Sequence, residues 1–446
     1  MRVQAGRVNI TGGSMQNAHK YIVLQLSFLL VLTLTTMSTT LGQEDVVAKT
    51  ADGVLPKASE ADSTKSDKES KPEAAKDEEP AEKALPKYEF SIEHSISYTN
   101  VKSQDSTGTC WSFATASFIE SELIRQEKGQ HDLSEMFIVK NIYKDKAQNY
   151  VLRQGKANFS QGALAHDFIN SAHRFGLVPE EIYSGRDDNS KRHDHSEMEV
   201  VMKGFLEAVA KQKSLSPRWK IASDRILDTY LGDSPTRFSY RDRSYSPKEF
   251  SQSLGFNGKD YQSITSFTHH PFGESFVLEI PDNYSNGSFQ NVPIDNLIET
   301  IDFAIENGFS VAWDGDVSEK GFSAARGIAV LPANGSRRDL FTRPGEELVV
   351  NQEMRQDAFN SLATTDDHLM HLVGISRDSE GNKYYVVKNS WGEIGKHKGF
   401  IHLSEAFVRL KTVAIIVHKD AVIEMKEAKG ISKDDNTEVS ADNPGS

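Results

Sequence analysis

The sequence predicts an α+β fold, in which helices fill the first half of a globular region and strands fill the second half. Three observations predict it. Apolar residues recur at helical spacing before about residue 175, short β-branched or apolar runs follow residue 368, and Gly, Asn and Asp separate those runs. The hydrophobic content is only 37% because polar segments at both ends dilute it. The core must therefore come mainly from about residues 89–418.

Four amphipathic segments predict helices. They cover residues 110–127, 133–147, 162–174 and 294–306. Glycines at the ends support three of these boundaries, because Gly129, Gly176 and Gly308 follow the first, third and fourth segments. The first helix is expected to begin at Cys110 itself.

Four short runs in the last part of the chain predict strands. They cover residues 368–375, 384–388, 400–403 and 413–417. Each is rich in apolar or β-branched residues and too short for a typical helix. His368 opens the first run, so we expect this histidine at the start of a strand.

The first 42 residues have the character of a secretory signal. Lys20 precedes an apolar run at 21–34, and small and hydroxyl residues lead to Gly42, near which we expect cleavage. The run has about 14 residues, whereas a membrane span needs roughly 20. We therefore expect an exported protein (periplasmic, secreted or cell-surface), in contact with a membrane only if this segment stays uncleaved as an anchor.

Polar segments flank the globular region. Residues 43–87 and 421–446 are rich in charged and small residues and poor in aromatics, so a disordered stalk and a flexible acidic tail are expected there. The net charge is −13, and basic and aromatic residues form no interleaved stripe. This composition argues against a nucleic-acid partner.

The chain contains a single cysteine, Cys110. It can form no intramolecular disulfide and cannot share a metal with a second thiolate. A lone cysteine is commonly a buried, inert thiol. Its context favours a nucleophile instead, because Gln104 and Gly108 precede it closely and Trp111 follows it at the start of an apolar helix.

His368 and Asn389 supply the groups that a nucleophilic thiol requires. A free thiol has a pKa of about 8.5. The N-terminus of the predicted helix and a nearby imidazolium are both expected to lower it. Thiolate attack on a carbonyl, followed by proton transfer from the imidazolium to the leaving amine, would then be possible.

Three further side chains fit this chemistry. Asn389 would accept the second ring N–H of the histidine, and Trp391 could shield that hydrogen bond from water. Gln104 would offer its side-chain amide to a tetrahedral oxyanion, together with the backbone N–H of Cys110.

A metal site is the alternative reading of the histidine segment. Asp366, Asp367, His368 and His371 are all possible ligands. On a strand, however, residues 368 and 371 point to opposite faces, which argues against shared ligation. Asn389 alone could also be an ordinary turn residue.

These motifs resemble those of the papain-like cysteine peptidases. The resemblance rests on Gln104 and the segments 108–113, 368–374 and 389–392. It implies a two-lobed fold within residues 88–420, with Cys110 on the helical lobe and His368 and Asn389 on the β-sheet lobe. It also implies catalytic roles for these residues and for Gln104, with no metal and no organic cofactor.

The chain resembles one branch of that family, bleomycin hydrolase and aminopeptidase C. The resemblance rests on the segments 132–137, 176–181 and 398–400, on the absence of disulfide cysteines and on a long insertion. His368 follows Cys110 by about 260 residues, against roughly 130–150 in papain-like enzymes. About 100 residues would therefore be inserted, mostly within 185–310, as a separate subdomain. Gln161 and Gly162 would occupy the position of the substrate-cleft glycines, with Trp391 nearby.

The resemblance implies a peptide or protein substrate, and a homo-oligomer is possible. In that branch a C-terminal arm enters the cleft and reads the substrate amine, but residues 426–446 do not resemble this arm. Aminopeptidase action is the preferred expectation, and endopeptidase action is the alternative. A non-catalytic binding module and an acyl transferase to amines remain as further hypotheses.

Overall fold

The computed structural model describes residues 87–424, except 187–190 and 336–337. All of them belong to one compact unit, Pro80–Ser446. The predicted signal segment and almost all of the predicted stalk and tail lie outside the described residues. No helix in the described ranges combines the length and the apolar character that crossing a bilayer requires.

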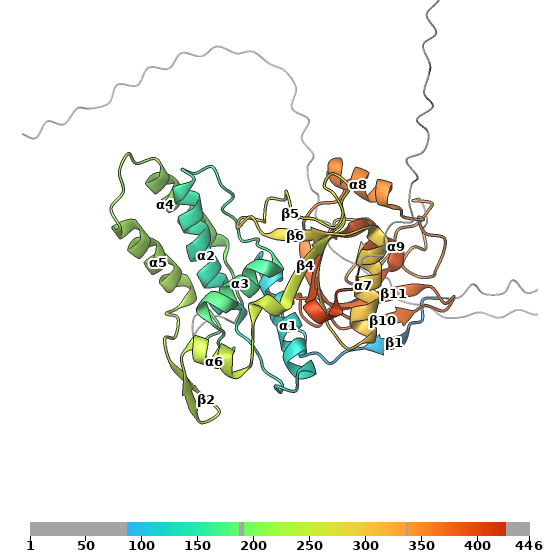
Figure 1. Ribbon diagram of the computed structural model, residues 1–446, viewed down its shortest axis with the longest axis horizontal. Helices are drawn as coiled ribbons and strands as arrows, with labels where there is room; N and C mark the ends of the chain where they lie inside the picture. The colour runs from blue at the N-terminus through green and yellow to red at the C-terminus, as the bar shows by residue number, and fades with distance from the viewer. Residues whose placement is uncertain (1–86, 187–190, 336–337, 425–446) are drawn as a thin grey trace, which may run out of the picture. The chain divides into compact units, whose positions relative to one another are not determined.

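The elements follow the predicted order, with most helices first and the long strands last (Figure 1). The helices are α1 (Cys110–Arg125), α2 (Glu135–Leu152), α3 (Ala165–Phe175), α4 (Ser196–Ala210), α5 (Arg218–Leu231), α6 (Pro247–Ser253), α7 (Ile294–Glu306), α8 (Gln352–Asn360) and α9 (Glu405–Lys411), with short 3₁₀ turns η1 (Gly258–Asp260) and η2 (Lys419–Ala421). The strands are β1 (Ser91–Ser95), β2 (Phe238–Tyr240), β3 (Arg243–Tyr245), β4 (Tyr261–Thr265), β5 (Ser275–Val277), β6 (Ser288–Asn291), β7 (Val311–Gly315), β8 (Phe322–Ser323), β9 (Ile328–Ala329), β10 (His368–Arg377), β11 (Lys383–Lys388), β12 (Phe400–Ser404) and β13 (Thr412–His418).

The α+β fold class is confirmed, and the helix ends show where the sequence pattern was imprecise. Helix α1 begins at Cys110 and α7 has the predicted bounds. Helix α2 begins only at Glu135, because the side chain of Ser134 accepts a hydrogen bond from the Phe137 N–H and caps the helix there. It then continues to Leu152, beyond the predicted end.

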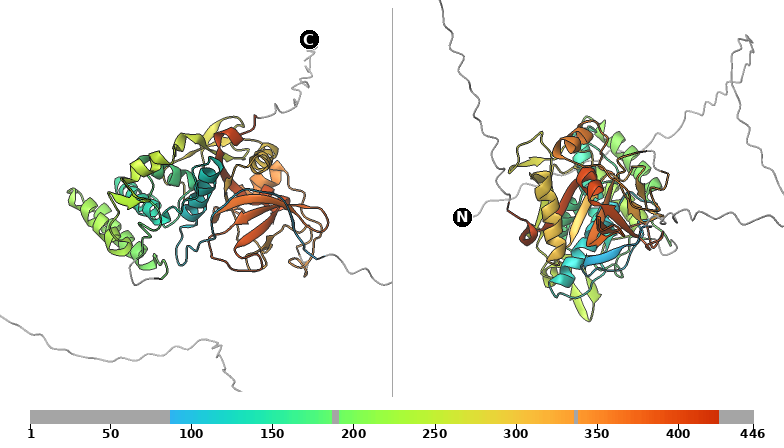
Figure 2. Two further views of the ribbon diagram at one scale, coloured as in Figure 1. Left: turned by 90° about the horizontal axis from the view of Figure 1, so that it is seen from below. Right: turned by 90° about the vertical axis from the view of Figure 1, so that its right-hand side faces the viewer.

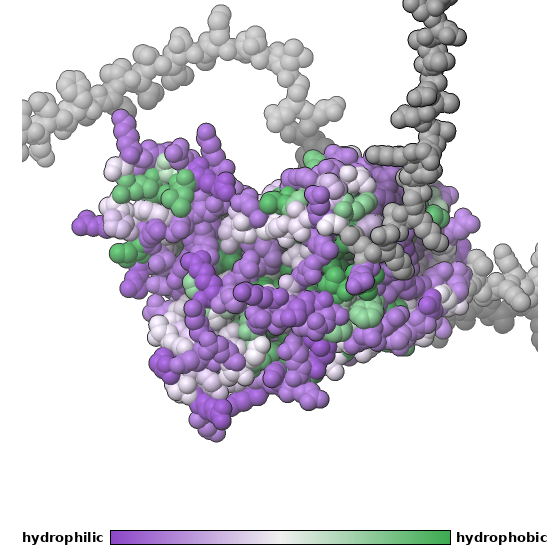
Figure 3. Space-filling view, in the orientation of Figure 1, coloured by the Kyte–Doolittle hydropathy of each residue, from purple (hydrophilic) through white to green (hydrophobic). Residues whose placement is uncertain are grey.

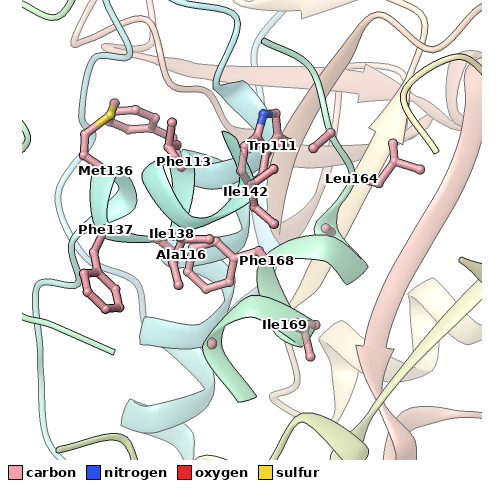
Figure 4. Close-up of a cluster of buried hydrophobic side chains, with 14 of the residues drawn as sticks. Trp111, Phe113, Ala116, Met136, Phe137, Ile138, Ile142, Leu164, Phe168 and Ile169 are labelled. Carbon is pink, nitrogen blue, oxygen red and sulfur yellow. The ribbon is translucent and has the colours of Figure 1, made fainter. Parts of the chain in front are cut away.

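Two packed cores divide the described chain into a helical lobe and a sheet lobe (Figure 2). Figure 4 shows the centre of the helical lobe, where Trp111 and Phe113 of α1 pack with Ile142 of α2 and Phe168 of α3. In the sheet lobe, β10 lies between β7 and β11 and is antiparallel to both. Helix α1 packs against β10, so the first helix of one lobe contacts the central strand of the other.

Residues of the expected insertion at 185–310 join both lobes, and its description as a separate subdomain stays a prediction. Its first part, including α4, α5 and α6, places Met198, Leu227 and Phe250 in the helical-lobe core. From β4 onward the range contributes strands to the large sheet, because β4 pairs with β13 and with β6, while Phe267 and Phe289 still pack in the helical-lobe core. The strands in this range have at most five residues, so their apolar pattern was too short to predict that they join the sheet. The domain boundaries stay predictions.

Apolar side chains gather on the outer surface of α4 and α5. Figure 3 shows hydrophobic area over these helices on a face that is otherwise largely hydrophilic. Val200, Val201 and Ile221 are exposed there. These exposed side chains do not test whether the protein forms a homo-oligomer, which stays a prediction.

A buried ionic group joins α1 to the start of the domain. Glu120 accepts hydrogen bonds from Thr99 Oγ1 at 2.5 Å and from the Leu133 N–H at 2.7 Å. Burial raises the pKa of Glu120 to about 7, although the ammonium of Lys102 acts in the opposite direction. Nearby, Lys388 donates to the Thr99 carbonyl at 2.8 Å.

Glu120→Ala should therefore destabilise the fold strongly. Removing this carboxyl leaves buried donors unsatisfied and takes away the negative charge that acts most strongly on Lys388, so we expect the free energy of unfolding to fall by about 3–5 kcal/mol. Urea denaturation measures this change. Glu306→Ala, at an exposed position on α7, is the control and should change stability by less than about 0.5 kcal/mol. Equal small effects in both variants would contradict a structural role for Glu120.

Candidate active site

Helix α1 places Cys110 at its first residue, beside the sheet lobe. The helix starts without a side-chain cap on Thr109 and has no acidic residue in its first turn. Trp111 anchors this end, because its indole N–H donates to the carbonyl of Gln161 at 3.0 Å. The Cys110 thiol is half-buried.

His368 and Asn389 meet through a buried hydrogen bond. His368 is the first residue of β10, and its Nε2 lies 2.8 Å from Asn389 Oδ1. The ring of Trp391 packs against the imidazole with 4.7 Å between centroids. Asn389 is held in turn, because its backbone N–H donates to the carbonyl of Gly399 at 2.9 Å. The ring orientation is therefore determined by Asn389 on one side and Trp391 on the other.

The strand residue that follows the histidine lies beside the thiol. The backbone N–H of Leu369 hydrogen-bonds the sulfur of Cys110. About two turns along the helix, Ser117 Oγ lies 2.7 Å from His371 Nδ1. These two contacts align the start of α1 with the start of β10.

Gln104 connects the loop before α1 to the asparagine segment. Its side-chain oxygen accepts a hydrogen bond from Ser390 Oγ at 2.7 Å, and its backbone N–H donates to the Ser390 carbonyl at 2.8 Å. Its Nε2 donates to the Thr107 carbonyl at 2.6 Å. An amide NH₂ has two donors, so one N–H is available besides the one used by Thr107.

The pKa values of the thiol and the imidazole differ from the expectation. Burial, with the carboxylates of Asp366 and Asp314, raises the pKa of Cys110 to about 12, against the effect of the Leu369 and Trp111 N–H groups. Burial also lowers the pKa of His368 to about 4, although Asn389 acts in the opposite direction. Removal of the thiol from water therefore acts against the expected effect of the helix terminus.

The metal alternative does not fit the geometry of the histidine segment. His368 Nε2 faces Asn389, whereas His371 Nδ1 faces Ser117 on the helical lobe. Within the described residues, the one group of at least three His, Cys, Asp or Glu side chains close enough for a metal is His269, His270 and Glu279, between β4 and β6.

Comparisons with known proteins agree with this geometry. A model of the papain family cysteine protease matches residues 87–225, and a model of the Peptidase C1-like family matches residues 225–441. The two matches are consecutive and together include Cys110, His368 and Asn389. The chain belongs to the papain-family cysteine peptidases.

Relatives of this peptidase carry aminopeptidase names. It is 23% identical over 365 residues to Aminopeptidase G of Lactobacillus delbrueckii subsp. lactis, which covers 72% of this chain and 81% of the relative. It is 24% identical over 384 residues to Aminopeptidase C of Lactococcus lactis subsp. lactis (strain IL1403), covering 75% and 84%. The crystal structure of PepW from Lactobacillus rhamnosis HN001 shares its fold, with a TM-score of 0.61 at 20% identity over 75% of this chain and 83% of that chain.

Gln161 and Gly162 lie on the helical-lobe side of the peptidase site. Gln161 Oε1 accepts a hydrogen bond from the Gly108 N–H at 2.7 Å, and its Nε2 donates to Glu199 at 2.7 Å. Gly162 lies against the carboxylate of Asp282, which a Cβ at this position would overlap. Both residues therefore support the wall of the site, and substrate contact stays a prediction for them.

Asp314 is a site residue that the sequence analysis missed. It lies on β7 and is paired in register with Leu369, the residue that contacts the sulfur. The one available signal was a carboxyl inside an otherwise apolar strand, Val311–Gly315. Asp366, which was considered only as a metal ligand, acts on Cys110 from the same side.

Proposed function

We propose that this peptidase hydrolyses peptide bonds with Cys110 as the nucleophile and His368 as general base and acid. The observation that carries the proposal is the buried 2.8 Å contact between His368 Nε2 and Asn389 Oδ1, on the strand that packs against α1. Since Nε2 is engaged by the asparagine, Nδ1 is the ring nitrogen that exchanges protons with the sulfur.

The reaction begins when the thiol proton moves to His368 Nδ1 and the sulfur attacks the scissile carbonyl carbon. The oxyanion accepts hydrogen bonds from the Cys110 N–H and the second N–H of Gln104 Nε2. The C–N bond then breaks, and the imidazolium gives its proton to the leaving amine. Water, deprotonated by the same imidazole, hydrolyses the resulting thioester and releases the acid and the thiol.

Asn389 acts as a positioning residue in this scheme. Its Oδ1 accepts a hydrogen bond from the Nε2–H group of His368. This bond holds the tautomer in which Nδ1 is free to accept the thiol proton.

Aminopeptidase action is the subtype that the relatives favour, because the relatives at 22–24% identity are named aminopeptidases C, E, G and W. We therefore expect hydrolysis of an unblocked aminoacyl fluorogenic amide to exceed that of its N-acetylated counterpart by at least about 100-fold in kcat/KM. Steady-state rates under reducing conditions measure this ratio. Faster turnover of N-blocked peptides would instead establish an endopeptidase.

We also propose that the peptidase acts outside the cytoplasm. The support is Lys20, the apolar run at 21–34 and the small residues that lead to Gly42.

A further inference from the structure

Asp314 is a buried carboxyl whose close polar neighbour is a second carboxyl, that of Asp366. Only 4% of Asp314 is exposed, and within the described residues no N–H donor or cation is hydrogen-bonded to either of its oxygens. Burying an unpaired carboxylate costs several kcal/mol, so a chain normally surrounds such a group with donors or a cation. The missing partner therefore points to a group that arrives from outside.

Asp366 supplies a second carboxyl at the same place. The pairing of β7 with β10 brings the segment before His368 beside Asp314, and the two carboxyls lie within hydrogen-bonding reach of each other. Asp366 Oδ2 is also buried without a partner. Within the described residues, no Lys, Arg or His forms a salt bridge with either carboxyl.

A third acid increases the negative charge of this pair. Asp282, between β5 and β6, lies against Gly162 and interacts electrostatically with both Asp314 and Asp366. Burial and the neighbouring carboxylates raise the pKa of Asp366 to about 7 and that of Asp314 well above its usual range. At neutral pH the pair retains a proton that a bound cation would displace.

The pair lies beside the nucleophile. Asp314 is in register with Leu369, whose N–H contacts the Cys110 sulfur. A small cavity adjoins Asp314 and is lined also by Leu164, Ala165 and Leu369. Both carboxylates raise the pKa of the thiol, which places them within electrostatic range of it.

We propose that Asp314 and Asp366 bind the free α-ammonium group of the peptide substrate and so restrict cleavage to the first residue. This inference rests on the proposed aminopeptidase function. In an N-terminal residue the ammonium nitrogen is separated from the scissile carbonyl carbon by one atom, so its binding site must adjoin the nucleophile. An ammonium group offers three N–H donors to the unpartnered oxygens and compensates their charge.

Binding of the ammonium would also activate the thiol. The two carboxylates raise the pKa of Cys110, and a bound cation offsets their charge. An unblocked substrate would therefore promote formation of the thiolate that attacks it, whereas an N-blocked peptide would not.

Asp314→Asn and Asp366→Asn test the inference, with Asp357→Asn on the exposed surface of α8 as the control. These isosteric changes remove charge but keep shape. For the unblocked aminoacyl amide we expect KM to rise at least tenfold in both site variants, with a smaller change in kcat. The ratio of kcat/KM for the unblocked substrate to that for the acetylated substrate should fall at least tenfold in both site variants, and Asp357→Asn should leave this ratio unchanged.

Several outcomes would overturn the inference. If the wild-type protein prefers the unblocked substrate and both site variants keep that preference, the ammonium is bound elsewhere and the proposed function stands. If the wild-type protein prefers N-blocked peptides, the aminopeptidase proposal itself fails. If the variants lose only the hydrolysis of blocked peptides that carry Lys or Arg next to the cleaved residue, the carboxyls bind a side-chain cation instead.

A second measurement does not depend on turnover. Without substrate, Asp366→Asn should increase the rate of Cys110 alkylation by iodoacetamide at pH 7, because removing the negative charge lowers the thiol pKa. Intact-protein mass spectrometry follows the reaction, and circular dichroism verifies the fold. An unchanged rate in a folded variant would show that this carboxyl is not close to the nucleophile, against the inference.

Discussion

Replacing Cys110 with alanine should abolish peptide hydrolysis while leaving the fold intact. No other thiol exists in the chain to form the thioester, so kcat/KM should fall by on the order of 10⁴-fold or more. The side chain is half-buried and has no packing role comparable to that of Trp111, so thermal unfolding should shift little. Initial rates and thermal melting by circular dichroism measure the two quantities.

The matched control is Ser112→Ala at the next-but-one position of the same helix. Ser112 is buried and donates to the Glu135 carbonyl at 3.0 Å, so this change removes a structural hydrogen bond near the site. We expect it to reduce stability by about 1 kcal/mol with a much smaller effect on rate. Retained activity in a cysteine-free protein would refute the thiol mechanism.

The second large effect is expected at His368, with a clearly smaller one at Asn389. His368→Ala removes the general base and acid, which contributes roughly 10²–10⁴-fold to the rate. Asn389→Ala removes one neutral hydrogen bond to the ring, worth about 1 kcal/mol, so we expect a loss of roughly fivefold to tenfold. Values of kcat/KM for both variants on one substrate test the order.

The pH profile distinguishes positioning from structural damage in the asparagine variant. Burial lowers the pKa of His368 to about 4, while its hydrogen bond to Asn389 raises it. Without that bond the pKa should fall further, so the acidic limb of kcat/KM should move to lower pH. Equal losses in the two variants, or an unmoved acidic limb, would contradict the role assigned to Asn389.

The parts of the site that depend on local order could be predicted from the sequence. Cys110 at the start of a helix followed from the apolar spacing after Trp111, and His368 at the start of a strand followed from the run that it opens. Their partnership was suggested by the resemblance of three short motifs to one family. In the structure, His368 and Asn389 are hydrogen-bonded to each other, as that resemblance implies.

The parts that depend on tertiary burial could not be predicted. The raised pKa of Cys110 results from removal of the thiol from water and from Asp366 and Asp314, which the fold brings near it from the segment before β10 and from β7. Asp314 appeared as a lone polar residue in a short apolar run. The division of residues 185–310 between the lobes depends on pairings such as β4 with β13, for which periodicity within one strand contains no information.

The most direct test of the proposed mechanism is covalent labelling of Cys110 by an aminoacyl chloromethyl ketone with a free amino group, compared with its N-acetylated counterpart. The proposed function predicts one adduct on Cys110 by peptide mapping, formed at least tenfold faster with the free amine and strongly slowed in His368→Ala. Labelling by both reagents at the same slow rate as an ordinary exposed thiol would contradict an activated nucleophile that recognises the substrate amine.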